Sequence, residues 1–169
     1  LTNLVLAALS LLARAVFRAD RRTLAAYAVF WMALHNLAQV WSYIPARTMF
    51  HDGGDIYWFC RGLHVPPWLV LTAGTAVLAL GFARLFLRDM PAVFATLGLA
   101  RAGRIGLFAL AWSTAFLYYG GMPVAESVHS LRDPALLLVA LELVVGAAIG
   151  AAAMRRIADG GKFSSTVPR

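Results

Sequence analysis

Residues 67–87 read PWLVLTAGTAVLALGFARLFL, and Arg84 is the one charged side chain among them. A helix rises about 1.5 Å per residue, so about 20 apolar residues cover the roughly 30 Å hydrocarbon layer of a bilayer. The apolar residues here form a continuous run instead of a stripe with helical or strand period, which indicates lipid as the surrounding solvent. This stretch therefore predicts a transmembrane helix.

Four further apolar segments flank this stretch, at residues 1–17, 23–43, 105–119 and 134–157. Charged residues make up only 14% of the 169-residue chain, against about a quarter in ordinary soluble domains. We therefore expect an all-α protein, a polytopic transmembrane helical bundle of about five spans that forms one domain over residues 1–169. The chain begins with Leu1 instead of Met, which suggests a missing natural N-terminus, and its first residues do not resemble a cleavable signal peptide.

The net charge of +7 is the excess of 14 Arg and one Lys over eight acidic residues, and the basic residues lie at the ends of the apolar segments except for Arg14, which is inside the first. That distribution is typical of membrane topology and argues against a nucleic-acid partner. Eleven basic residues lie in the segments 18–22, 84–104 and 155–169, and the opposite side has Arg47, Arg61 and Arg132. The positive-inside rule then predicts a bacterial inner-membrane protein with its N-terminus outside and its C-terminus in the cytoplasm. Outer loops are expected at 44–66 and 120–133, and Pro91 predicts a short helix on the cytoplasmic surface.

Two ionisable side chains lie within predicted spans. His35 and Glu142 are each eight residues from the outer end of their segment, about 12 Å by helix rise. An ionisable group at that depth costs several kcal/mol unless it is paired or hydrated. We expect the two to face each other as an interhelical polar pair, with His35, Gln39 and Tyr43 on an inward-facing stripe. A ligand, proton or cofactor site and the absence of any contact are the alternatives.

Gly146 and Gly150 follow Glu142 on the same face of the last segment. This small-xxx-small spacing lets two helices approach closely. Packing within the chain is the expected use, and docking against another subunit is the alternative.

The predicted outer loops contain several groups able to bind a metal: His51, Asp52, Asp55, His64 and His129. Histidine and carboxylate ligands suit several metals, but no pair has the spacing of a known metal motif, so ordinary loop polarity is the favoured interpretation. A bis-histidine haem would need a second histidine at the depth of His35, and every other histidine is in a predicted loop. The sequence leaves any cofactor unknown.

Three stretches of the sequence together resemble the conserved segments of a known family. Residues 34–39 read LHNLAQ, 66–81 read PPWLVLTAGTAVLALG and 118–130 read YYGGMPVAESVHS. In this order they resemble the M50 (site-2) intramembrane metalloproteases, which have a His-Glu motif ending in a second histidine, an Ala-Gly-Pro helix and a later Leu-Asp-Gly segment.

The resemblance lacks catalytic groups. Asn36 stands in place of the family's general-base glutamate, Gln39 in place of its second zinc histidine, and only His35 matches a ligand. Zinc-activated water cannot be generated and deprotonated in the usual way without those groups. The predicted outward position also conflicts with the family's cytoplasm-facing site. The resemblance therefore implies a non-proteolytic relative.

We expect an integral membrane subunit or scaffold of a larger complex, without its own catalytic centre, whose partners are the lipid bilayer and other membrane proteins. One alternative is a degenerate M50-like relative, or a protein that binds a metal or small ligand through the outer histidines and acids. Another is a small oligomeric transporter that uses His35 and Glu142.

Overall fold

The computed structural model describes residues 23–50, 55–121 and 133–158, together with residues 3, 5–9 and 12. These residues form helices and short turns without a strand, which confirms the all-α expectation. The elements in chain order are α2 (Thr23–Phe50), α3 (Asp55–Gly62), α4 (Pro67–Arg84), η1 (Leu85–Asp89), α5 (Met90–Thr96), α6 (Arg101–Trp112), η2 (Ser113–Tyr119) and α8 (Asp133–Ala158). The segments η1 and η2 are π-helical.

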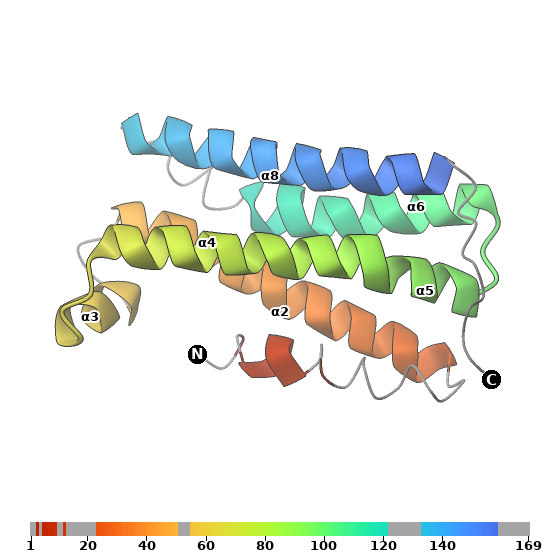
Figure 1. The fold of residues 1–169 in the computed structure, drawn as a ribbon, viewed down its shortest axis with the longest axis horizontal. Helices are drawn as coiled ribbons and strands as arrows, with labels where there is room; N and C mark the ends of the chain where they lie inside the picture. Colours follow the sequence, from red (N-terminus) through yellow and green to blue (C-terminus); the bar gives the residue numbers. More distant parts are fainter. Residues whose placement is uncertain are drawn as a thin grey trace.

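The long helices lie side by side as a bundle (Figure 1). Helix α2 crosses α4 and also packs on η2, whereas α8 packs along α6 and on η1. Their shared core is aromatic, with Trp41, Phe82, Phe86 and Phe116 in mutual ring contact. The Phe82 and Phe116 ring centroids are 5.0 Å apart, and Trp41 and Phe82 are completely buried. These large rings join four elements, so they dominate the apolar area that the bundle buries.

Helices α4, η1 and α5 form one continuous helix, although Pro91 lies inside it. A proline lacks an N–H, and its ring collides with the carbonyl four residues earlier, which is that of Leu87. The helix widens immediately before this point, where the Met90 N–H donates to the Leu85 carbonyl five residues back. The helix therefore continues past residue 87, and the expectation of a separate helix that starts near Pro91 is wrong.

The helix α4–η1–α5, Pro67–Thr96, is the one helix among the described residues that is long and apolar enough to cross a membrane. The predicted spans 23–43, 105–119 and 134–157 lie in helices α2, α6–η2 and α8. Most of the predicted span 1–17 lies outside the described residues. The five-span topology thus stays a prediction.

Two helices end in the same left-handed turn. At the end of α5, Gly98 has φ of 60°, its N–H donates to Ala95, and the Leu99 N–H donates to Phe94. At the end of α3, His64 has φ of 54°, and Val65 donates back to Cys60 in the same pattern. Glycine adopts this conformation without strain and histidine does not, so the α3 turn is the less favourable one.

Candidate functional site

His35 lies midway along α2 and contacts η2. Its Nδ1 is 3.2 Å from the Tyr119 hydroxyl oxygen, and the two rings meet edge to face with centroids 5.8 Å apart. Trp31, one helical turn earlier, also contacts the imidazole, with ring centroids 5.7 Å apart and the ring planes tilted by 36°. His35 remains exposed, as does Tyr43 at 48%. The imidazole contacts Tyr119 of η2, and the expectation that His35, Gln39 and Tyr43 form an inward-facing stripe stays a prediction.

The cluster of Trp31, His35 and Tyr119 is here called the histidine face. Its polar groups can donate and accept hydrogen bonds. A neutral imidazole has one donor and one acceptor nitrogen, so the Tyr119 hydroxyl either donates to Nδ1 or accepts from it, according to the tautomer. Gln39 is half-buried one turn further along α2. The side chain of Glu142 lies outside the described residues, so the predicted pairing of Glu142 with His35 stays a prediction.

Gly146 and Gly150 lie against α6 and η2. The Trp112 indole Nε1 donates to the Gly146 carbonyl at 2.9 Å. A Cβ on Gly146 would be 3.2 Å from the Phe116 ring, and one on Gly150 would be 3.1 Å from Trp112 Nε1. The two glycines thus let α8 approach the indole closely, which is a packing role within this chain.

Charged groups meet at the end of the bundle formed by η1, α5, the start of α6 and the end of α8. Asp89 is completely buried, and its Oδ2 is 3.7 Å from Arg84 Nε. Arg104 Nε donates to the Leu99 carbonyl at 2.8 Å, and Arg156 Nη1 donates to the Leu87 carbonyl at 2.5 Å. The last bond gives a partner to the carbonyl that Pro91 cannot bond.

The metal candidates are mostly untested. His51, Asp52, His129 and the Asp55 side chain lie outside the described residues, and His64 is exposed at the α3 turn. Within the described part of the chain, no group of three or more His, Cys, Asp or Glu side chains gathers in a metal-binding arrangement.

Sequence reasoning missed three residues that the structure places at these contacts: Asp89, Trp112 and Tyr119. A tyrosine 84 residues from His35 gives no local signal of their contact. Asp89 did offer a signal, because a lone carboxylate that follows Arg88 at the end of an apolar run, five residues after Arg84, has basic partners within reach.

No protein-family model, no curated protein and no solved structure matches this chain.

Proposed function

We propose that this chain is an integral membrane subunit that spans the bilayer several times and acts through helix contacts within a larger complex, without a catalytic centre of its own. The proposal has two parts, membrane insertion and a covering partner, and a different observation supports each.

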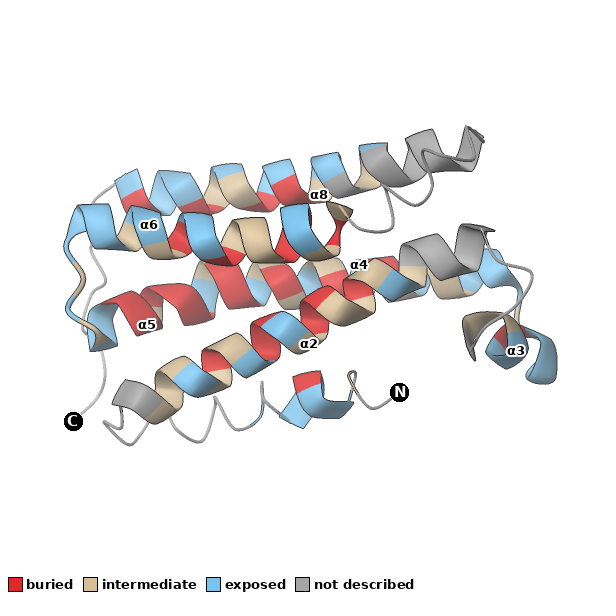
Figure 2. Ribbon diagram, turned by 180° about the vertical axis from the view of Figure 1, so that it is seen from behind, coloured by how far each residue is buried: buried red, intermediate tan, exposed pale blue. Residues whose placement is uncertain are grey.

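Membrane insertion is supported by the apolar exterior of the bundle. Residues on the outer faces of α4, α6, η2 and α8 are exposed (Figure 2), and many are large and apolar: Val77, Leu80, Leu110, Leu117, Leu143 and Val144. Leu80, in the middle of the long helix, is 71% exposed. Soluble monomers rarely expose apolar patches beyond a few hundred Å², whereas lipid chains are a favourable environment for such a surface.

The exposed arginines support an orientation. Arg88, Arg101 and Arg155 come from three helices, and those parts of the helices meet at one end of the bundle (Figure 1). Arg61 lies on α3, near the opposite end. By the positive-inside rule the arginine-rich end faces the cytoplasm, which in a bacterium places the protein in the inner membrane.

The observation that carries the subunit proposal is the histidine face, on which His35 is exposed while Trp31 and Tyr119 are half-buried. An exposed imidazole about 12 Å below the outer end of a predicted span is unfavourable against hydrocarbon, and the penalty reaches several kcal/mol when the ring is charged. A helix of another subunit that covers Trp31, His35 and Tyr119 removes this penalty and supplies polar partners.

Thiol labelling tests insertion and orientation. In a Cys60→Ala background, Arg61→Cys and Arg101→Cys form a matched pair, because both positions are exposed and lie near opposite ends. An impermeant reagent is expected to label Arg61→Cys in intact cells and Arg101→Cys only after permeabilisation. The reverse pattern would contradict the orientation, and release of the protein from membranes by alkaline carbonate would contradict insertion.

Photo-crosslinking tests the subunit role. A benzophenone amino acid in place of His35 is expected to form an adduct with a second protein, whereas the same group at Leu80 faces lipid and forms none. Loss of the adduct when Trp31→Ala is added would show that the whole face is involved. A lone monomer in mild detergent, with no adduct at His35, would refute this part of the proposal.

A further inference from the structure

The short helix α3 lies at the end of the bundle opposite the arginine-rich end (Figure 1). It packs on α2 and α4, and Cys60 is its buried residue. Its other side chains include large apolar ones: Trp58, Phe59 and the adjoining Leu63 are each more than half exposed, as is Trp68 in the first turn of α4. An exposed apolar surface of this kind marks a site of interaction with a protein or a membrane.

The turn between α3 and α4 fixes α3 to the end of the long helix. The Val65 N–H donates to the Cys60 carbonyl at 2.9 Å, and His64 between them has φ of 54°. Pro66 and Pro67 follow directly, and a proline ring holds φ near −65°. The link has little rotational freedom, so the height of α4 in a membrane also sets the height of α3.

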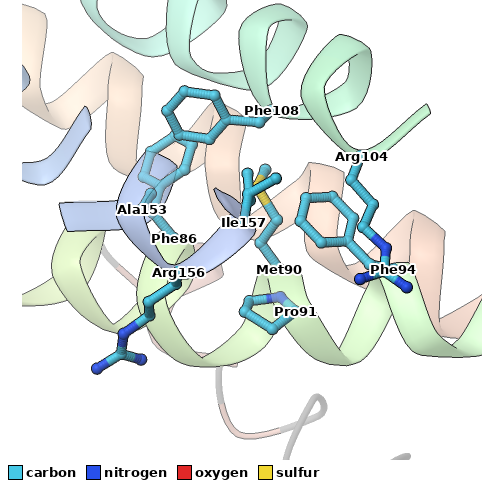
Figure 3. Close-up of a pocket in the computed structure, with 9 residues that line it drawn as sticks. All are labelled: Phe86, Met90, Pro91, Phe94, Arg104, Phe108, Ala153, Arg156 and Ile157. Carbon is cyan, nitrogen blue, oxygen red and sulfur yellow. The ribbon is translucent and has the colours of Figure 1, made fainter. Parts of the chain in front are cut away.

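The long helix defines that height. From Trp68 to Arg88 there are about 20 residues, or about 30 Å of helix, which equals the thickness of the hydrocarbon layer. Arg88 is exposed at the arginine-rich end, where Arg104 and Arg156 point away from each other on the two sides of a small apolar pocket (Figure 3). Tryptophan at one boundary and arginines at the other are typical of the two ends of a membrane span. With Trp68 at the outer boundary, α3 lies at the level of the outer headgroups.

We propose that α3 is an interfacial helix that binds the headgroup layer of the outer leaflet of a phospholipid bilayer; this rests on the proposed membrane insertion. A lipid surface fits better than a protein partner, because the exposed apolar side chains continue from α3 along α4 through Leu69, Val77 and Leu80. That face of α4 is the one proposed to contact lipid. Amphipathic helices of this kind immerse their apolar side about 5–10 Å into the boundary between headgroups and acyl chains.

Two opposite flanks of α3 suit the two layers of this boundary. Phe59 and Arg61 are two residues apart, so at 3.6 residues per turn they point about 160° apart around the helix axis. Arg61 Nη1 donates to the Tyr57 hydroxyl at 3.1 Å, and the guanidinium carbon lies 5.7 Å from the centre of the Trp58 ring. The guanidinium keeps four further N–H donors for lipid phosphate oxygens, while Phe59 enters the acyl boundary.

Spin labelling tests the position of α3. In a Cys60→Ala background, a nitroxide is attached to Phe59→Cys or to Arg61→Cys, and the full chain is placed in phosphatidylcholine nanodiscs. Paramagnetic resonance then compares collisions of the nitroxide with oxygen, which dissolves in the bilayer, and with a water-soluble nickel chelate. The ratio of oxygen to nickel collisions is expected to be about tenfold higher at Phe59→Cys than at Arg61→Cys, because one flank lies in the acyl boundary and the other in the wet headgroup layer.

A nitroxide at Leu80→Cys reports membrane insertion separately and is expected to collide mainly with oxygen. A Phe59→Cys nitroxide that collides mainly with the nickel chelate would overturn the inference, because α3 then lies in water. A Phe59→Cys nitroxide that neither reagent reaches would also overturn it, because α3 is then covered by protein. If the nitroxide at Leu80→Cys collides mainly with nickel, the membrane insertion fails, and this inference fails with it.

A second measurement keeps Cys60 and Phe59 in place. Tryptophan emission is recorded in lipids brominated close to the headgroup and in lipids brominated near the ends of the acyl chains. Trp58→Phe retains an aromatic ring and is expected to reduce quenching by the upper bromines while leaving quenching by the deep bromines unchanged. Unchanged quenching by the upper bromines would overturn the inference.

Discussion

The contact between Arg156 and the Leu87 carbonyl allows a quantitative test of how the long helix tolerates Pro91. In a regular helix the Leu87 carbonyl would accept a hydrogen bond from the N–H of residue 91, which proline lacks. Arg156 Nη1 lies 2.5 Å from that oxygen and replaces the missing donor from a different helix. Arg156→Leu removes this donor, so the Leu87 carbonyl loses its hydrogen bond from Arg156.

The expected loss follows from the type of bond. A hydrogen bond from a charged donor contributes about 1.5–3 kcal/mol. Arg156 is exposed and Leu87 is half-buried, so the lower end of that range applies, about 1.5 kcal/mol. Pro91→Ala restores an N–H that can bond the Leu87 carbonyl along the helix. In that background Arg156→Leu is expected to cost less than about 0.5 kcal/mol, a coupling of about 1 kcal/mol between the two positions.

The assay is reversible unfolding in dodecyl maltoside micelles titrated with dodecyl sulfate, followed by far-ultraviolet circular dichroism. Arg155→Leu is the control, because Arg155 is an exposed neighbour on the same helix and loses an equal charge. It is expected to change the free energy of unfolding by less than about 0.5 kcal/mol. An equal cost of Arg156→Leu in both backgrounds would refute the reasoning, as would a control that is just as destabilising.

The same titration checks five further substitutions. Gly150→Val places a Cβ 3.1 Å from the Trp112 indole and is expected to lower the free energy of unfolding by about 2 kcal/mol. Gly106→Val is the control, because a Cβ there would have no atom within 4 Å, and it is expected to change the free energy of unfolding little. Equal effects of the two substitutions would contradict the packing role of Gly150. Gly98→Ala is expected to lower the free energy of unfolding by about 1 kcal/mol, because φ at this position is positive. His64→Gly is expected to raise the free energy of unfolding by up to about 1 kcal/mol, because glycine adopts the positive φ of position 64 without strain. Shifts of opposite sign would show that the turns are not strained. Thr75→Val replaces a buried hydroxyl that has no hydrogen-bond partner among the described residues, and is expected to stabilise by about 1 kcal/mol; a loss would reveal a partner for that hydroxyl.

Much of the fold could be predicted because the tendency of a segment to form a helix depends mainly on its own residues. The segments 23–43 and 134–157 lie in helices, as their long apolar composition suggested. The prediction failed at Pro91, where the usual rule places a helix start. The structure keeps the helix continuous because a π-turn and an arginine 69 residues away satisfy the disturbed backbone, and a local rule cannot include that donor.

The candidate site was less predictable. The polarity of His35 within an apolar segment predicted that it needs a partner, and its described contact is with the Tyr119 hydroxyl, which the sequence did not indicate. The spacing of Gly146 and Gly150 indicated close helix approach, and only the structure identified Trp112 as the group that approaches. Spacing within one helix defines which residues share a face, but it does not define which helix that face meets.

The amino-acid sequence by itself determined the helical class, the apolar runs and the distribution of arginines, because each depends on how a short segment interacts with its solvent. The tertiary structure alone decided that the run beginning at Pro67 continues as one helix to Thr96. It also decided that Arg104 and Arg156 line one pocket. These features depend on side chains from distant segments meeting in one packed arrangement, and their energies arise only when the helices are together.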